Sequence, residues 1–284
     1  TWTNYNHKNS KLPKYGINDI EIDLNNDIWI GTDDSGLVYF DGNIWTAFNS
    51  ENSDLPDNDI NNVIIDNNGK IWVLYLSGFS YFNGDTWINY KKDNFPFTDF
   101  RNTSMIIDNP GSMWIGSNIY GLYRFDENKW IPYPTSNSGI PASYVVTINI
   151  DKNDNVWLST GYPPVWEVFH PYGLTVFNGE NWKTYNNDNT EFLKYCINSI
   201  AIDKSENLWL SIGIDDWYYG FHGRGLVYYD GLNWTLFTTE NSDLPSNIIY
   251  SLQFDNSNNL WIGSGDGLAR FDGENWTIYD ITNS

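Results

Sequence analysis

A tryptophan-bearing segment recurs six times along the 284-residue chain, and this repetition restricts the fold more than any other feature of the sequence. Each copy is followed, after a short interval, by a second tryptophan. The copies centre on the pairs Trp29 and Trp45, Trp72 and Trp87, Trp114 and Trp130, Trp157 and Trp182, Trp209 and Trp234, and Trp261 and Trp276. A period of roughly 40 to 50 residues predicts that each unit is one supersecondary element stacked on its neighbours.

Each unit contains four short segments rich in β-branched and aromatic residues. They are an apolar run ending in Asp, the Trp-bearing segment, a GLVYFDG-like segment and a WTxY segment, separated by Gly, Asn and Asp. Such segments are typical of antiparallel strands, and four strands per unit indicate a β-propeller blade. We therefore predict one all-β domain over residues 1–284, a propeller of six four-stranded blades. A seven-bladed closure is the alternative, because TWTNY at the N-terminus is a further fourth-strand motif in phase with the repeat.

The consensus I-x-x-I-x-x-D-x-x-x-x-[IL]-W-[IL]-G-[TS]-x-x-G-L-x-x-[FY]-D resembles the two-component regulator propeller repeat. The resemblance covers essentially the whole chain. It implies a location outside the cytoplasm, because the family is abundant in periplasmic sensor regions and secreted surface proteins of Bacteroidota. Family propellers usually have seven blades, whereas six complete units are found here. Members differ in ligand, so the resemblance assigns no function by itself.

Residues that recur in every unit are expected to build the scaffold. The tryptophans should pack between neighbouring sheets, and the glycine of each GL step should adopt a positive φ. The aspartate that ends each first segment should cap a tight turn, with calcium binding as the alternative. These aspartates are Asp23, Asp66, Asp108, Asp151, Asp203 and Asp255. The lone cysteine, Cys196, is expected to be a small buried apolar residue, and no cofactor is predicted.

The net charge of −21, from 36 acidic and 15 basic residues, argues against some partners. A surface this acidic repels phosphate backbones and anionic lipids, so neither nucleic-acid binding nor membrane insertion is expected. A glycan or protein ligand, or participation in a larger surface assembly, remains compatible with the composition.

Units four and five are longer than the others, and function in a repeat protein is expected where units differ. The excess falls between the second and third segments, and we predict inserted loops at 159–174 and 211–226. Both insertions are rich in aromatic residues and contain matched FHPYG and FHGRG strings. Aromatic faces beside polar groups suit a sugar or peptide. The residues predicted to bind a ligand are Trp166, His170, Tyr172, Asp216, Trp217, Tyr218, Tyr219, His222 and Arg224.

Three functions fit this reading. The first is a non-catalytic, extracytoplasmic recognition propeller that binds a glycan or protein through the two insertions. The second is a lyase or hydrolase of polysaccharide fragments with His170 or His222 as general base. The third is a structural protein of a cell-surface assembly. We expect no enzymatic activity, because the sequence contains no Gly-x-Ser-x-Gly motif, no phosphate-binding loop and no metal-ligand spacing.

Overall fold

The computed structural model describes residues 3–14, 16–91, 104–117, 119–126, 129–162, 170–186, 188, 190–216 and 220–280. At residues 91, 162, 170–172, 191, 214–216, 220 and 221 only the backbone is described. The chain divides into two compact units, Thr1–Ile115 with Arg124–Ile131, and Gly116–Tyr123 with Pro132–Ser284. The boundary between these units passes through the third sheet.

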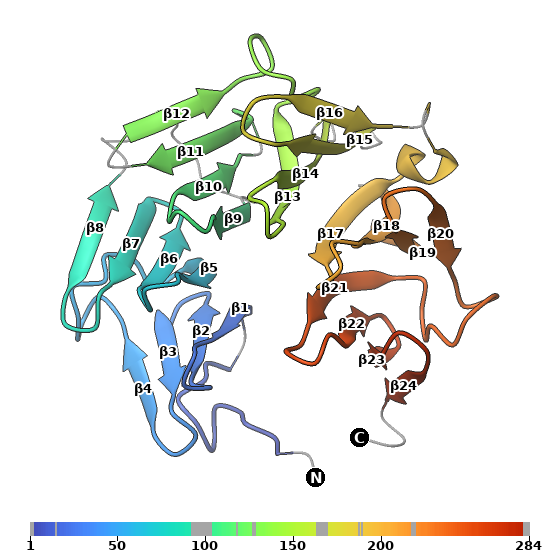
Figure 1. Cartoon of the computed structure of the whole chain (residues 1–284). Coiled ribbons are helices and arrows are strands. Elements are labelled where there is room, and N and C mark those ends of the chain that lie inside the picture. Colours follow the sequence, from blue (N-terminus) through green and yellow to red (C-terminus); the bar gives the residue numbers. More distant parts are fainter. Residues whose placement is uncertain are drawn as a thin grey trace. The chain divides into compact units, whose positions relative to one another are not determined.

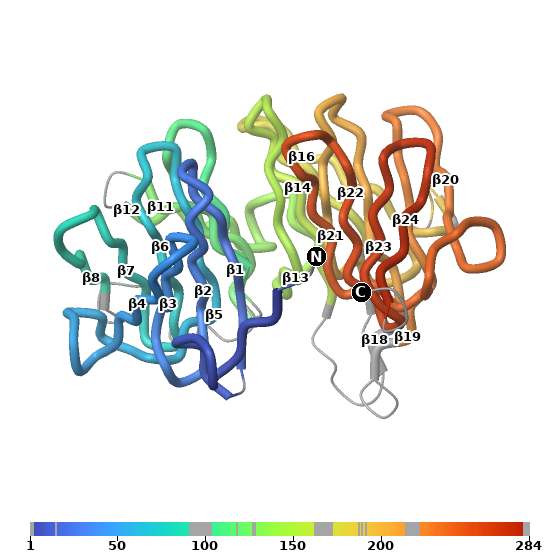
Figure 2. Tube along the Cα trace, turned by 90° about the horizontal axis from the view of Figure 1, so that it is seen from below, coloured from blue at the N-terminus to red at the C-terminus, as the bar shows by residue number. Residues whose placement is uncertain are grey.

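The strands form six four-stranded sheets, each made of consecutive strands in chain order (Figures 1 and 2). The first sheet contains β1 (Ile17–Ile22), β2 (Ile28–Thr32), β3 (Leu37–Phe40) and β4 (Trp45–Phe48). The second contains β5 (Ile60–Ile65), β6 (Ile71–Tyr75), β7 (Gly78–Phe82) and β8 (Trp87–Lys91). The third contains β9 (Ser104–Ile107), β10 (Met113–Gly116), β11 (Leu122–Asp126) and β12 (Lys129–Tyr133).

The remaining three sheets belong to the second unit. The fourth contains β13 (Tyr144–Ile150), β14 (Val156–Tyr162), β15 (His170–Phe177) and β16 (Trp182–Tyr185). The fifth contains β17 (Cys196–Ile202), β18 (Leu208–Asp216), β19 (Gly220–Tyr229) and β20 (Trp234–Phe237), and a short 3-10 helix, η2 (Glu191–Lys194), precedes it. The sixth contains β21 (Ile249–Phe254), β22 (Leu260–Ser264), β23 (Gly267–Phe271) and β24 (Trp276–Tyr279).

These sheets are the blades of a six-bladed, all-β propeller, as the sequence predicts. Within each unit the first strand of one blade contacts the first strand of the next: β1 meets β5, and β13 meets β17, which meets β21. Blades one and two are in the first unit, and blades four to six are in the second.

Aromatic side chains fill the space between consecutive blades. The second tryptophan of a blade stacks on an aromatic residue of its own third strand, as Trp234 does on Tyr229 with ring centroids 4.0 Å apart. The same tryptophan meets the last aromatic residue of the preceding blade, since Tyr185 lies 5.9 Å from Trp234. Such ring contacts add about 0.5–1.5 kcal/mol to the burial of apolar area. The predicted packing of the repeated tryptophans between sheets is therefore confirmed.

The N-terminal segment packs against blade one in the way that the end of a fourth strand packs against the following blade. The ring of Tyr5 lies 5.2 Å from both Phe40 and Trp45. Phe48 makes the corresponding contact on blade two, with its ring 6.3 Å from Trp87. Residues 3–5 are not in a strand, but their aromatic contact matches the phase in which TWTNY stands in the sequence.

The connectors between blades share one hydrogen-bonded fold. The side-chain amides of Asn9, Asn52 and Asn241 each donate to the carbonyl five residues earlier at 2.9 Å. The leucine of each following LP step is buried. In each of these N-S-x-L-P connectors, the asparagine amide therefore closes a turn back to the preceding segment and the leucine enters the core.

The insertions at 159–174 and 211–226 differ from the expected loops. Their described residues lengthen the hairpins β14–β15 and β18–β19, so that Tyr162 pairs with His170 and Asp216 pairs with Gly220. The two sides of each insertion supply backbone N–H and C=O groups to each other, so the flanking strands continue as a two-stranded ribbon.

Candidate functional site

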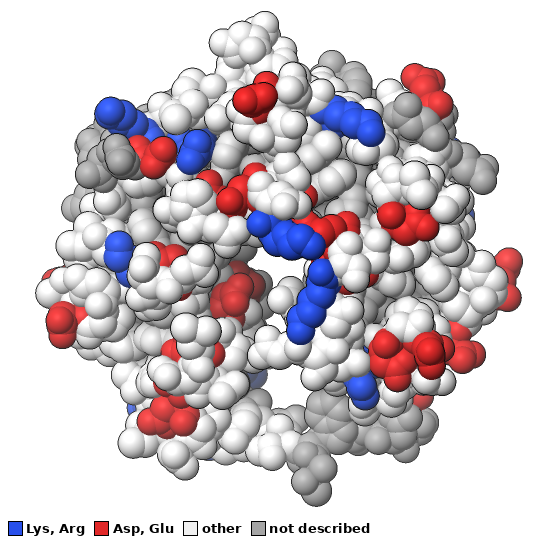
Figure 3. Space-filling model, viewed as in Figure 1, with Lys and Arg blue, Asp and Glu red and all other residues white. Residues whose placement is uncertain are grey.

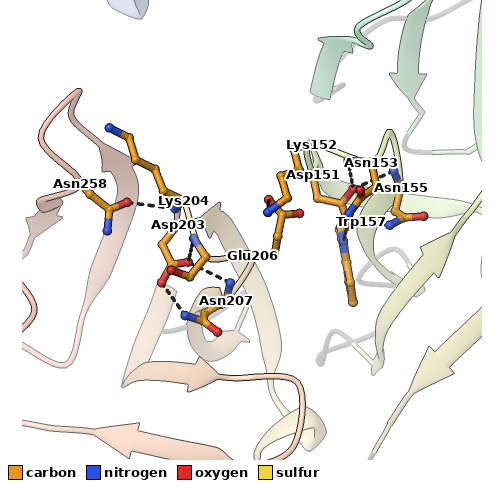
Figure 4. A network of polar contacts seen from close by, with 11 residues as sticks. Asp151, Lys152, Asn153, Asn155, Trp157, Asp203, Lys204, Glu206, Asn207 and Asn258 are labelled. Carbon is orange, nitrogen blue, oxygen red and sulfur yellow. Dashed lines mark hydrogen bonds and ion pairs between the residues drawn. The ribbon is translucent and has the colours of Figure 1, made fainter.

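The repeated aspartates are structural anchors. In blade four, one oxygen of Asp151 accepts the N–H groups of Asn153 and Asn155, both at 2.9 Å (Figure 4). The second oxygen accepts the indole N–H of Trp157 at 3.0 Å. This single carboxylate therefore closes the turn between two strands and fixes the tryptophan that packs beneath it.

The same anchor recurs in five of the six blades. The aspartate of each turn accepts an indole N–H at 2.9–3.3 Å, in the pairs Asp23–Trp29, Asp66–Trp72, Asp108–Trp114, Asp151–Trp157 and Asp255–Trp261. Blade five is the exception: Asp203 caps its turn, but the buried Nε1 of Trp209 has no hydrogen-bond partner. The predicted turn-capping role of these aspartates is confirmed. In the described part of the chain, no three His, Cys, Asp or Glu side chains are grouped so as to hold a metal.

Polar contacts also join the turns of blades four, five and six (Figure 4). Lys152 lies 3.3 Å from the carboxylate of Glu206. The backbone N–H of Lys204 donates to Asn258 Oδ1 at 2.9 Å, and its Nζ donates to the carbonyl of Asn256 at 2.6 Å. These groups are used in holding consecutive turns together, so they are poor candidates for ligand binding.

The two lengthened hairpins hold the predicted site. Trp166, Trp217, Tyr218 and Tyr219 lie outside the described residues. His170 and Tyr172 lie on β15 and Asp216 ends β18, and for these three only the backbone is described. His222 and Arg224 lie on β19 with exposed side chains.

Backbone pairing aligns the two insertions residue by residue. His170 pairs with Tyr162 near the end of β14, and His222 pairs with Ile214 near the end of β18. A register shift follows in each hairpin, just before Gly173 and Gly225, and both glycines have positive φ. The two hairpins therefore share one backbone pattern up to these histidines, and the described pairing of the blade-five hairpin continues two residues further, to Asp216 and Gly220.

Arg224 and Lys194 lie beside a single aromatic ring. The guanidinium of Arg224 is 5.6 Å from the centroid of the Tyr195 ring, and Lys194 Nζ is 5.2 Å from the same centroid. Cations within about 6 Å of a ring centroid are attracted by the ring quadrupole. We call Lys194, Tyr195 and Arg224 the cationic cluster.

The cationic cluster joins the two hairpins. Lys194 ends η2, and η2 packs against β15 of the blade-four hairpin. Leu193 of η2 is buried in a cluster with Leu174 of β15 and Ile197 of β17. Arg224 reaches Tyr195 from β19. The cluster therefore lies where elements of blades four and five meet.

The residues predicted from the sequence to bind a ligand include Arg224 but not Lys194 or Tyr195. The two missed residues precede the first strand of blade five, in a connector that the repeat marks only as a link. The string EFLKYC at 191–196 could have pointed to them. The blade-to-blade connectors lie at the same edge of the blades as the ends of the hairpins, so a connector with a cation and an aromatic residue is placed near the predicted site.

The edge position of the β18–β19 hairpin is fixed by the next connector. The N–H of Gly225 donates to the carbonyl of Asn247 at 3.1 Å. A Cβ added at Gly223 would lie 1.8 Å from that same carbonyl oxygen, so no larger residue fits there without movement of the backbone. Gly36 makes the equivalent bond to Asn58 in blade one at 2.9 Å.

Figure 3 shows acidic and basic side chains interspersed over the face drawn, with the acidic ones more numerous. Cys196 is buried, as predicted from the sequence. No helix in the described ranges has the length and apolar character needed to cross a membrane.

Comparison with protein families matches the Two component regulator propeller model to residues 243–266. These residues span part of a connector together with β21 and β22, and the same string of residues recurs in the other blades. The repeat recognised in the sequence is thereby confirmed. Comparison with curated proteins found no match.

Several solved structures share the fold. PorZ, an essential surface component of the type-IX secretion system of Porphyromonas gingivalis, aligns with TM-score 0.67 and 20% identity over 89% of this chain and 38% of PorZ. Virginiamycin B lyase from Staphylococcus aureus aligns with TM-score 0.65 and 13% identity over 95% of this chain and 85% of the lyase. YCF48 bound to D1 peptide aligns with TM-score 0.61 and 15% identity over 94% and 82%. This chain thus spans little more than a third of PorZ, and identities this low show the fold alone.

Proposed function

We propose that this protein is a non-catalytic, extracytoplasmic recognition propeller that binds a glycan through the lengthened hairpins of blades four and five. The carrying observation is that the segment joining the two blades touches both hairpins: η2 packs on β15, and the next residue, Tyr195, lies against Arg224 of β19. The other candidate ligand is a protein, in which case the hairpins would serve a surface assembly.

The residue types on the hairpins support a sugar ligand. The C–H face of a pyranose stacks on an aromatic ring while polar groups hold its hydroxyls. The insertions supply tryptophan and tyrosine from 166–172 and 217–219, and β19 adds the exposed side chains of His222 and Arg224. Shorter hairpins in the other blades provide the scaffold without this combination.

The repeat resemblance supports the proposed location outside the cytoplasm. PorZ, with which this chain shares its fold, is a bacterial surface component, and YCF48 is seen with a bound peptide. These relationships make a surface assembly and a peptide ligand the alternatives that an experiment has to separate from glycan recognition.

A glycan array and a thermal-shift screen on the wild type and on a Trp166→Ala/Trp217→Ala double variant test the proposal. We expect at least one glycan to raise the melting temperature of the wild type and to lose that effect in the variant. Tyr250→Ala is the matched control, because Tyr250 is an exposed aromatic residue on β21, outside the hairpins.

The proposal fails if no glycan stabilises the wild type, or if the double variant binds as tightly as the wild type. Glycan turnover that disappears in His222→Ala while binding persists would favour a lyase or hydrolase instead. Binding of a protein in place of any glycan would favour the assembly role.

A further inference from the structure

We propose that this chain associates with further copies of itself through two of its blade-to-blade connectors, the basic connector at 6–13 of one copy binding the acidic connector at 49–56 of the next. The two segments keep these names below. Their residues are distinct from those of the proposed glycan site, so the two proposals are independent of each other.

The two connectors fold as the same hydrogen-bonded turn. Ser10 Oγ donates to the carbonyl of Asn6 at 2.6 Å, and Ser53 Oγ donates to the carbonyl of Asn49 at 2.7 Å. Both connectors also make the asparagine amide bond at 2.9 Å described above, and both bury their leucine. Residues at the same position of the two strings therefore take the same place on the turn.

The exposed positions of this turn carry opposite charges in the two connectors. Lys8 and Lys11 are exposed on the basic connector, and the exposed residues at the same two positions of the acidic connector are Glu51 and Asp54. The connector at 238–245 is acidic at both positions as well. The turn thus accepts either sign of charge, so its fold does not dictate the lysines.

Charge is also separated along this part of the chain. Residues 1–14 contain three lysines, one histidine and no carboxylate side chain. Between Lys14 and Lys70 there are twelve Asp and Glu residues and no Lys or Arg. A basic segment beside such an acidic stretch, in a chain with a net charge of −21, is typical of an interaction surface.

Negative charge continues directly after the acidic connector. Asp57 and Asp59 follow it in the sequence, and burial, together with the charges of Asp33 and Asp57, raises the pKa of Asp59. Carboxylates that repel one another in this way are stabilised by a cation placed beside them. The connector at 238–245 has no carboxylate at the equivalent positions, which favours the acidic connector as the partner of the lysines.

A second copy of the chain supplies a partner that matches the basic connector. Because both connectors are the same turn, the backbone positions of the two lysines are spaced like those of the two carboxylates, and both ion pairs can form together. The contact joins different segments of the two copies and is therefore heterologous. Repetition of such a contact builds a ring or an open row of copies.

The net charge of the copies does not prevent this contact. The Debye length is about 8 Å at physiological ionic strength, so charges far from the facing turns are largely screened. Exposed ion pairs are individually weak, and two short turns bury less than the roughly 1,200 Å² of a stable interface. The association is therefore reversible and requires a high concentration of copies.

The test is analytical ultracentrifugation of the whole chain over a concentration series, at about 0.15 M and about 1 M salt. The lysine-reversed variant is Lys8→Glu/Lys11→Asp, and the carboxylate-reversed variant is Glu51→Lys/Asp54→Lys. Each places on its turn the residue types that the same turn carries elsewhere in the chain, so both variants should fold. Melting temperatures within a few degrees of wild type verify this.

We expect each reversed variant by itself to associate about tenfold or more weakly than wild type, because like charges then face each other. An equimolar mixture of the two reversed variants should recover association, since the lysines of one meet the carboxylates of the other. High salt should weaken the association of wild type. The matched control is Glu240→Lys/Asp243→Lys, which has the net charge of the carboxylate-reversed variant and should associate like wild type.

The design separates a specific contact from an effect of net charge. The carboxylate-reversed variant is less negative than wild type, so net charge alone would strengthen its association. The inference is wrong if wild type stays monomeric at every concentration, if a reversed variant associates as tightly as wild type, or if the mixture does not associate. A loss confined to the control would place the contact at 238–245 instead. Binding of monomeric wild type to anionic lipid vesicles, lost in the lysine-reversed variant, would replace the second copy with a membrane surface.

Discussion

Replacing Trp72 with phenylalanine should destabilise the protein considerably more than the same replacement at Trp209. The two tryptophans occupy equivalent places in blades two and five and are both buried. Each has a tyrosine ring of its own third strand 4.6 Å away, Tyr81 for Trp72 and Tyr228 for Trp209. Each also meets other rings, Phe79 for Trp72 and both Phe237 and Phe271 for Trp209. The polar difference is at the indole nitrogen, because Trp72 Nε1 donates to Asp66 at 3.0 Å whereas Trp209 Nε1 has no partner among the described residues.

The magnitude follows from this difference. Both substitutions lose apolar contact area, at a cost of about 1–2 kcal/mol. Trp72→Phe also loses a buried hydrogen bond to a charged acceptor, which contributes about 1.5–3 kcal/mol. Trp209→Phe removes a buried donor that has no partner, and the relief of about 1 kcal/mol or more offsets its loss of area. The expected difference between the two variants is about 3 kcal/mol.

The measurement is the free energy of unfolding from urea denaturation, followed by circular dichroism and by fluorescence so that a single transition is verified. The pair Asp66→Asn and Asp203→Asn serves as a second comparison, because only Asp66 bonds an indole. Equal losses for Trp72→Phe and Trp209→Phe, within about 0.5 kcal/mol, would refute the reasoning about the indole bond.

Three further predictions concern pH, backbone and metal. Burial, and secondarily the charge of Asp19, raises the pKa of Glu21 from 4.5 to about 7. The folded state therefore keeps a proton that the unfolded state releases, so stability should fall between about pH 4.5 and 7, and Glu21→Gln should flatten this fall in urea titrations. Gly223→Ala should lower the melting temperature more than Gly231→Ala, because a Cβ at Gly223 meets the backbone of Asn247, whereas at Gly231 it meets nothing within 4 Å and costs only the strain of a side chain at φ +90°. Millimolar calcium, or its removal by EDTA, should leave the melting temperature unchanged, since the repeated turn aspartates accept N–H bonds; a calcium-dependent shift would show that an aspartate turn binds the ion.

Much of the scaffold could be predicted because its signals are local. The positive φ of Gly36 could be predicted from the GL step that recurs along the chain. The turn at Asp151 could be predicted from an Asp that stands two residues before Asn153, whose N–H it accepts. Turn chemistry of this kind depends on residues within about four positions of one another, so a repeat displays it several times over. The number of blades follows from counting those signals.

The candidate site could be predicted only in part. The excess length of units four and five pointed to β15 and β19, and the exposed positions of His222 and Arg224 agree with a role in binding. The expectation of loops was wrong for the described residues, because two segments of similar length can satisfy each other's backbone groups by pairing.

The sequence by itself determined the six-bladed architecture, the turn-capping aspartates and the place of the insertions, because each is encoded in a repeating local pattern. Only the tertiary structure showed that Arg224 lies beside the Tyr195 ring, and that Trp209 lacks the indole bond found in the other five blades. The first requires η2 and β19, far apart in the chain, to pack at one edge. The second could not be foreseen, because blade five carries the same Asp and Trp at the same spacing as the other blades.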